Sequence, residues 1–595
     1  MAYDALTTSG INNLINTYKT NEQSKRITPL TKRKTYYENL NSAYSTLSSK
    51  LDSLKSILSE LMNASSTSIF YSKAAVSSNT NFLNVVATSG AIDGTHSIRI
   101  NQLAKNDTVL SIDLNSSAAS TVITEPGTHE FIIKTGDGSG GEFVSKVSVT
   151  FESSDFTNGQ ISNSTLMQKI QSAINTDKAV VVSSSVSGST VASGSFVIDL
   201  NGTETVINYS AGSYSDVIDN IVSQVNSISG LTAEKVVDGS NYQLKITVND
   251  SSKYITIKND TGTLLSELGI NVTKEKGASG LVSASIFSPV TGYSQLSIKS
   301  KNSGYDYRIT EISETGSNTA LSAVGLNFGT TRQAFVQNSG NDTPGFIYTT
   351  DQLNAKLTFN GVDVERNSNT ISDLIDGTTI TLKSVMQSSD ADVEISINND
   401  VTKIKDKIND FITKFNDVYK YIKDKSRTVD SSRGLFVGDI TASSLLSTLS
   451  NIAYSSVTGI PDNEINTLSK IGITFNVDSG LILSDSDRLE NVINNNLNEL
   501  INLFTLDTNG IAVKLYDRIN PYLGADGYIA KSKSSFDTTI SSLSDSITAA
   551  QKSIDKNAEI LRSKYQKMQI QLAQLLSYQN YFSLFGTSSY TSLTG

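Results

Sequence analysis

Histidine, a frequent acid–base catalyst and metal ligand near neutral pH, occurs only twice in this chain, at His96 and His129. Neither has a second histidine four residues away, so the helical zinc-protease pattern is absent. His96 alternates with Ile98 and Ile100 on one face of a predicted strand, and His129 follows a Pro-Gly turn signal. Both histidines are therefore expected to have half-buried structural roles.

A glycine-rich segment at 136–141 formally matches the dinucleotide-binding pattern G-x-G-x-x-G. That chemistry requires a helix N-terminus directly after the glycines to receive the pyrophosphate. Here Phe143, Val144, Val147 and Val149 continue as a strand instead. The segment is therefore predicted to be the loop of a β-hairpin.

Carboxylates are plentiful, and composition alone leaves open a glycosidase-like pair. The chain has no Trp for a sugar-binding platform and no Cys for a nucleophile or a thiolate metal site. Asp485 and Asp487 could begin a calcium loop, but no twelve-residue loop with a central Gly and a terminal Glu follows. A capping box formed by Ser484 and Asp487 is the better interpretation. We therefore expect no enzyme activity, no cofactor and no metal site.

The net charge and the hydropathy of the chain limit the kinds of partner that are expected to bind it. The net charge is −10 and the isoelectric point is about 5.0, which argues against nucleic acid as the main partner. No apolar run reaches the roughly 18 residues that a membrane span needs, so no membrane insertion is expected. The first residues lack the basic and apolar regions of a cleaved signal peptide. If the protein is exported, another route is expected.

Both ends of the chain carry the 3.5-residue apolar period of a coiled coil. From Leu30 to Leu61, steps of three and four fall on apolar or aromatic residues at every position except Arg33. Pro29 suits a first helical turn, and Thr28 is the expected N-cap. A shorter segment repeats the pattern from Val401 to Ile422.

The C-terminal stripe runs from Phe536 to Leu575. It contains one step of four plus four, from Ala550 through Ile554 to Ala558, which should unwind a supercoil locally. A seam this narrow needs another helix to bury it, and the three separate stripes are most simply buried against one another.

The middle of the chain has strand-like alternation broken by Gly, Asn and Asp clusters. Two pairs of similar short segments, called internal echoes below, indicate a duplicated unit of a helix and strands. One pair ends in Ile174-Asn175 and Val225-Asn226; the other lies at 264–270 and 320–326.

The sequence thus predicts an α+β multidomain protein, in which both chain ends form a long helical coiled-coil leg and β-rich head domains are inserted between them. The predicted parts are a flexible N-terminal segment (1–28), an N-terminal leg helix (29–69), a β-rich head of two or three modules (70–398), the C-terminal part of the helical leg (399–585) and a flexible tail (586–595). The side chains predicted to form the leg and oligomer seam are Tyr37, Leu40, Tyr44, Leu47, Leu51, Leu54, Phe411, Phe415, Ile540, Leu543, Ile547, Ile554, Leu561, Met568 and Leu572.

Five short motifs remain: Ser9-Gly10-Ile11-Asn12, Ile27-Thr28-Pro29-Leu30, the run from Val364 to Asp373, Leu468-Ser469-Lys470-Ile471-Gly472-Ile473 and Asp526-Gly527-Tyr528-Ile529. They resemble motifs of the bacterial flagellar filament cap, or flagellar hook-associated protein 2, family. The resemblance covers both ends and patches of the centre.

The resemblance implies a secreted protein at the distal tip of the flagellar filament, exported by the flagellar secretion apparatus. It implies a homo-oligomeric ring of about five subunits, flagellin as the protein folded and inserted beneath that ring, and a cytoplasmic chaperone before export. Two alternatives remain at this point: an extracellular adhesin that binds through its β head, and a hook–filament junction protein.

Overall fold

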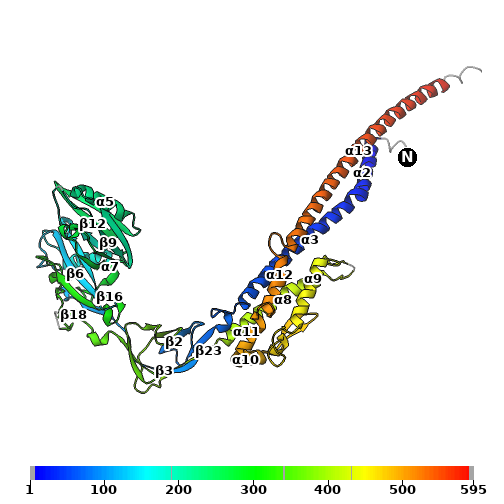
Figure 1. Cartoon of the computed structure of the whole chain (residues 1–595). Helices are drawn as coiled ribbons and strands as arrows, with labels where there is room; N and C mark the ends of the chain where they lie inside the picture. Colours follow the sequence, from blue (N-terminus) through cyan, green and yellow to red (C-terminus); the bar gives the residue numbers. More distant parts are fainter. Residues whose placement is uncertain (1–6, 189, 339–341, 431, 588–595) are drawn as a thin grey trace, which may run out of the picture. The chain divides into compact units, whose positions relative to one another are not determined.

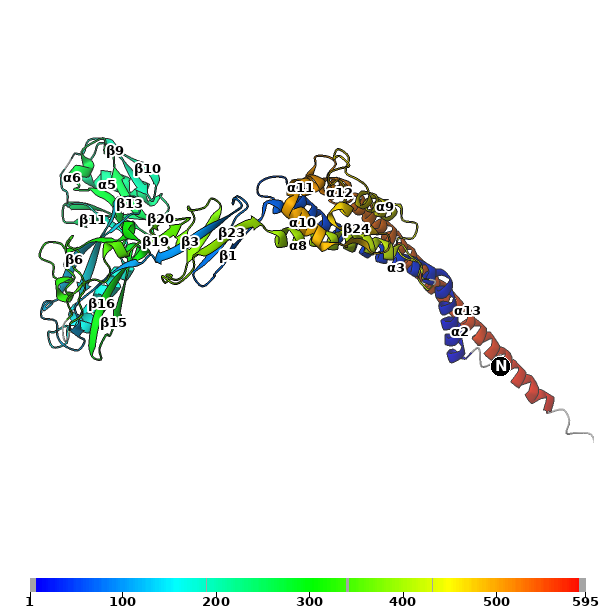
Figure 2. The same ribbon diagram turned by 90° about the horizontal axis from the view of Figure 1, so that it is seen from below.

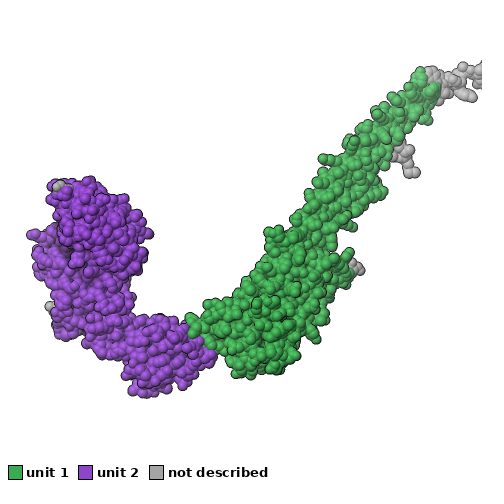
Figure 3. Space-filling view, in the orientation of Figure 1, with its two compact units in different colours: residues 1–74, 88–90, 399–595 green, residues 75–87, 91–398 purple. Residues whose placement is uncertain are grey.

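The chain divides into two compact units in a computed structural model, which describes residues 7–188, 190–338, 342–430 and 432–587. Unit 1 combines the two ends of the chain, 1–74 and 399–595, with the short stretch 88–90 (Figure 3). Unit 2 consists of residues 75–87 and 91–398.

Unit 1 is mostly helical, and its two longest helices come from opposite ends of the chain (Figure 1). Its α-helices are α2 (Thr8–Glu22), α3 (Thr28–Leu61), α8 (Val401–Lys425), α9 (Ile440–Tyr454), α10 (Ser486–Asn495), α11 (Leu497–Thr505), α12 (Ile511–Ile519) and α13 (Tyr528–Thr587). A hairpin of β24 (Ile473–Asn476) and β25 (Gly480–Leu483) interrupts the helices.

The core of unit 1 is built where α3 meets α8. Leu47, Leu51 and Leu54 of α3 share one cluster with Phe411 and Phe415 of α8, and all five are fully buried. Apolar side chains of α9 to α12 complete this cluster. The 3.5-residue seams of α3 and α8 are thus buried partly by short helices that had no such seam of their own.

The N-terminal region differs from the predicted flexible segment at 1–28. Residues 8–22 form α2, and Gln23–Ile27 make a π-helical turn that leads directly into α3. The physical reason is a docking contact: Ile11 and Ile15 are buried against Ala558 of α13. Residues 1–6 and 588–595, including most of the predicted tail, lie outside the described residues.

Two predicted helix caps are wrong. Thr28 is the first residue of α3 rather than its cap, and its hydroxyl donates to the Gln23 carbonyl at 3.3 Å. At α10 the cap is Asp485, whose carboxylate accepts from the Arg488 amide at 2.9 Å, while the Ser484 hydroxyl donates to the Gly472 carbonyl. A carboxylate one residue closer to the helix displaces the hydroxyl, since both suit an N-cap.

Unit 2 contains three separate hydrophobic cores. The first lies between the sheet β1-β23-β3-β19-β20 and the small sheet β2-β22-β21. Its strands are β1 (Lys73–Ser77), β2 (Leu83–Ala87), β3 (Gly94–Gln102), β19 (Ala355–Phe359), β20 (Val362–Arg366), β21 (Thr370–Ile371), β22 (Thr378–Leu382) and β23 (Val393–Asn399).

The second core joins the sheet β15-β16-β4-β18 to the β7-β6-β17 end of a seven-stranded sheet and to helix α4 (Asn163–Thr176). Its elements are β4 (Asn106–Leu110), β5 (Leu114–Asn115), β6 (Gly127–Gly136), β7 (Glu142–Phe151), α7 (Ala278–Leu281), β15 (Val282–Phe287), β16 (Tyr293–Ser303), β17 (Ile309–Glu314) and β18 (Gly345–Phe346).

The third core packs helix α5 (Tyr214–Asn226) against the sheet β11-β12-β8 and the β10-β9-β13-β14 end of the seven-stranded sheet. Its elements are β8 (Val180–Val182), β9 (Gly194–Leu200), β10 (Thr203–Tyr209), β11 (Leu231–Asp238), β12 (Asn241–Val248), β13 (Tyr254–Lys258), α6 (Leu264–Glu267) and β14 (Val272–Lys276).

The internal echoes mark equivalent structures in the second and third cores. The Asn175 side chain, at the end of α4, both donates to the Ala284 carbonyl (2.8 Å) and accepts from the Ala284 amide (2.9 Å). Asn226, at the end of α5, makes the same pair of bonds to Ala233 (3.0 and 2.8 Å). Each amide side chain thereby continues a strand edge in the same way, while a duplicated unit stays a prediction.

The second pair of echoes also agrees. The Ile270 amide donates to the Leu265 carbonyl and the Leu326 amide donates to the Leu321 carbonyl, both at 2.8 Å. Gly269 and Gly325 lie between them with φ of 61° and 73°, a left-handed conformation that favours glycine.

Candidate assembly surface

The two-helix arm of unit 1 pairs α13 with α2, the π-helical turn and the first part of α3 (Figures 1 and 2). We define this arm as residues 7–39 and 528–587. Polar contacts set its register: Lys19 with Asp555 (2.8 Å), Gln23 with Gln551 (3.2 Å) and Arg562 with Asn12 (2.7 Å). The partners are more than 500 residues apart in sequence. The arm exists only because the chain returns after unit 2.

Of the predicted seam residues, those near the base of the arm are brought together. Leu40, Tyr44, Leu47, Leu51, Leu54, Phe411 and Phe415 are buried in one cluster. Tyr37 is half-buried, with its ring 6.0 Å from that of Phe536. The Tyr44 hydroxyl donates to Asp439 at 2.6 Å, and burial together with that hydrogen bond raises the pKa of Tyr44.

Further out, burial along the seam becomes intermittent. Leu543 and Ile554 are buried, whereas Ile540, Ile547, Leu561 and Leu572 are only half-buried and Met568 is exposed. The seam is therefore continuous in the helix of α13 but only partly covered within one chain.

The distal end of α13 carries most of the large apolar side chains that are exposed on the described part of the arm. The first turns of α2 lie beside Leu561 and Tyr565, and α13 continues from there to Thr587. Large side chains along this extension are 60% to 71% exposed: Ile570, Leu575, Tyr578 and Phe582. From Met568 to the last residue of the sequence there is no Asp, Glu, Lys, Arg or His. An uncharged, apolar and exposed helix is typical of a surface that binds another protein.

The residues considered for chemistry have structural roles in the fold. The ring of His96 stacks on Phe359, with centroids 5.2 Å apart. The Nδ1 atom of His129 accepts from the Thr319 amide at 3.2 Å, and burial lowers the pKa of this histidine. The predicted hairpin loop at 136–141 is confirmed: it connects β6 and β7, and Asp137 accepts the amides of Ser139 and Gly141.

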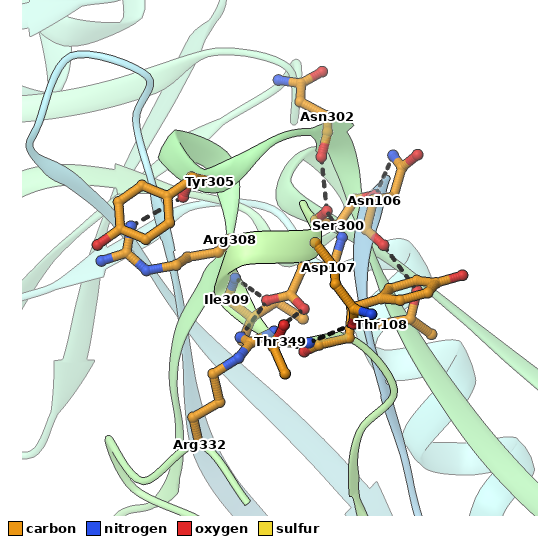
Figure 4. A network of polar contacts seen from close by, with 12 residues as sticks. Asn106, Asp107, Thr108, Ser300, Asn302, Tyr305, Arg308, Ile309, Arg332 and Thr349 are labelled. Carbon is orange, nitrogen blue, oxygen red and sulfur yellow. Dashed lines mark hydrogen bonds and ion pairs between the residues drawn. The ribbon is translucent and has the colours of Figure 1, made fainter. Parts of the chain in front are cut away.

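A buried ion pair in unit 2 also has a structural explanation (Figure 4). Asp107, fully buried on β4, accepts both terminal nitrogens of Arg332, at 2.8 and 2.6 Å, and the Ile309 amide at 3.0 Å. Arg332 also donates to the Tyr348 carbonyl. These bonds fasten the segment before β18 to the sheet.

The described residues contain no group of three or more His, Cys, Asp or Glu side chains placed to hold a metal ion. None of the described helices is sufficiently long and apolar to cross a membrane.

Comparison with known proteins finds one family at both ends of the chain. The family model for the N-terminus of flagellar hook-associated protein 2 matches residues 9–107, and that for its C-terminus matches residues 353–577. Together these segments include more than half of the 595 residues. The unmatched stretch 108–352 holds the second and third cores of unit 2.

Individual relatives agree with the family match. The A-type flagellar hook-associated protein 2 of Pseudomonas aeruginosa is 25% identical over 365 residues, which cover 60% of this chain and 73% of the relative. The Salmonella typhimurium flagellar hook-associated protein 2 is 27% identical over 250 residues, covering 40% and 51%. The crystal structure of the flagellar cap protein D1–D2–D3 domains from Escherichia coli is 18% identical, covers 83% of this chain and 99% of its own, and has a TM-score of 0.44. Since the two models of one family match both helical ends and the adjoining β module, the chain belongs to the flagellar hook-associated protein 2 family.

Proposed function

We propose that this chain caps a flagellar filament: it forms a ring at the filament tip and promotes the folding and insertion of exported flagellin. The family supports this function and does not favour the adhesin or hook–filament junction alternatives. The observation that carries the proposal is the exposed, uncharged end of α13. A cap must hold a filament while its own body stays outside it, and an apolar helix at the end of an arm provides such a grip.

The exposed apolar side chains at the end of α13 can supply enough free energy for binding. Burying a large apolar side chain contributes about 1.5–3 kcal/mol, so Ile570, Leu575, Tyr578 and Phe582 together offer about 6–12 kcal/mol before the entropic costs of association. Several copies in one ring would add their contributions through avidity. The partly covered seam of α13 is a further surface on which filament subunits can pack.

The remaining partners follow from the same proposal. Exported flagellin is the protein that the ring inserts, a ring of about five subunits is the expected self-assembly, and a cytoplasmic chaperone covers the apolar end of α13 before export. Export by the flagellar secretion apparatus then places the protein at the distal tip.

The test deletes the exposed end of α13 and keeps the rest of the fold. Truncation after Lys567 deletes the exposed end of α13 but leaves its contacts with α2 and α3 intact. Thermal unfolding of the truncated protein should match that of the full chain, while labelled protein should no longer appear at filament ends in electron micrographs.

A matched control replaces exposed apolar residues elsewhere. V206Q/V237Q changes two valines of unit 2 that are 56% and 55% exposed, and it should retain tip binding. Filaments of normal length, with label at their ends, in a strain carrying only the truncated protein would refute the proposal.

A further inference from the structure

The middle of the two-helix arm has a one-sided core: Leu543, Ala550 and Ile554 of α13 are buried, whereas the N-terminal segment beside them buries less. On the N-terminal side no side chain between Ile15 and Leu40 is buried, although the helix is continuous there. Ile27, Leu30 and, on α13, Ile547 are only half-buried. Two helices expose the outer sides of their shared seam, and a third helix is the usual way to cover it.

An open groove of about 510 Å³ lies along this part of the arm. Its lining residues come from the π-helical turn, the start of α3 and the facing turn of α13: Gln23, Ile27, Thr28, Thr31, Lys32, Thr35 and Gln551. The lining thus holds one isoleucine, three threonines and two neutral amides besides Lys32.

One cation, Lys32, lines the groove, and Lys25, Arg26 and Arg33 are near it in the sequence. In the part of the chain that the structure describes, Lys25, Lys32 and Arg33 have no ion pair. Arg26 contacts Glu22 at 3.9 Å and donates to the Ser553 hydroxyl at 3.4 Å. Lys25, Lys32 and Arg33 are therefore available to a partner.

The charge of the arm differs in sign from that of the rest of the molecule. Residues 7–39 and 528–587 hold 13 Lys and Arg against 6 Asp and Glu, a net charge of +7. Unit 2 holds 19 against 32, a net charge of −13. A second arm packed alongside the first would bring two groups of +7 together, so like-charge repulsion disfavours another copy of this chain as the third helix.

We propose that this groove binds an acidic, amphipathic helix of the filament subunit on which the cap sits. Apolar residues of that helix would cover Ile27 and the threonines, and its carboxylates would meet Lys32 in the lining and the adjacent Arg33. The inference rests on the proposed capping function and adds the chemistry of the partner surface. It uses the middle of the arm, whereas the grip described above uses the distal end of α13.

The first experiment identifies the occupant directly. Because the chain has no cysteine, T31C gives the full-length protein a single thiol for a photoactivated cross-linker at the groove. The labelled protein is bound to filaments assembled from the flagellin of the same cell, irradiated and digested for peptide mapping. S53C, at an exposed position of the same helix outside the groove, is the control.

A cross-link from position 31 to a flagellin helix with net negative charge is the expected result, with a much weaker signal from position 53. A cross-link to a second copy of this chain, to a basic or uncharged segment, or equally from both positions would overturn the inference.

The second experiment measures how much the basic side chains contribute to tip binding. K32E/R33E should weaken tip binding about tenfold at about 0.1 M salt, and the defect should shrink to less than about twofold at about 1 M, where the Debye length falls from about 10 to about 3 Å. The control K420E/K531E makes the same change in net charge at two exposed lysines away from the groove and should bind like wild type.

Equal effects of the two double variants, or a defect that salt does not relieve, would overturn the inference. Wild-type protein that fails to bind filament ends at either salt concentration would instead refute the capping function itself.

Discussion

The docking of α2 on α13 is the part of the arm most open to a quantitative test. The Thr7 side chain caps α2 by accepting the Gly10 amide at 3.1 Å, but a helix of 15 residues is marginal on its own. Its anchors are Ile11 and Ile15, which are 3% and 1% exposed, and the ion pair of Lys19 with the exposed Asp555. Most of the docking free energy should therefore come from two isoleucines.

Replacing Ile15 with alanine removes the more deeply buried anchor. Burying a single helix face leaves more room for relaxation than a closed core, so the cost should lie at the lower end of the usual range for such truncations, about 2–3 kcal/mol. Since each 1.4 kcal/mol is tenfold, the opening equilibrium of α2 should shift about 30- to 150-fold. Native-state hydrogen exchange of the amides of residues 12–22 measures this directly.

The neighbouring residue provides the control. Leu14 is a similar side chain that is 39% exposed on the other side of α2, and L14A should change exchange by less than about threefold. The amides of α8 should be unaffected in both variants, because α8 belongs to the core at the base of the arm. Equal exchange in I15A and L14A would show that α2 is not held in the way that the structure indicates.

Three further outcomes are expected in unit 2. N175A should lower its free energy of unfolding by about 1–3 kcal/mol in a denaturant titration, because two backbone groups of Ala284 lose their partner. R332M should lower the free energy of unfolding by about 3–5 kcal/mol, since it leaves the buried Asp107 carboxyl without its partner, and adding D107N should recover part of that loss. Burial raises the pKa of Asp177 from 3.8 to about 6, so the stability that this group contributes is fully present below pH 3.8 and is lost as the pH rises through 6. D177N, uncharged at every pH, should therefore gain stability relative to wild type as the pH rises from about 4 to about 6; a constant difference over this range would contradict this assignment.

The helical parts of the leg could be predicted from sequence because their signal is local. A 3.5-residue apolar period without internal Gly or Pro can be buried only as a helix, so α3, α8 and α13 appear wherever the period does. The same holds for the alternating pattern of the middle, which predicts its strands.

Other features had a weaker signal. Ile11, Ile15 and Tyr18 follow a spacing of four and three, which marks one face of a helix, but three positions are too few to separate a docked helix from a flexible end. The deciding partner, Ala558, is a small residue more than 500 positions away. The Asn175 and Asn226 echoes were visible as a repeat, yet their role as side-chain extensions of strand edges depends on strands that arrive from elsewhere.

By itself the sequence determined which segments are helical, which are strand-rich, and that two distant stripes each need a partner to cover them. Only the tertiary structure decided how far each stripe is covered. Burial depends on which element comes to lie alongside, and the chain supplies short helices at the base of the leg, α2 further out, and no described element for the distal end of α13. The surfaces proposed for assembly carry a local apolar pattern that is stabilised by burial. The chain's own fold does not cover them, so a partner is needed to bury them.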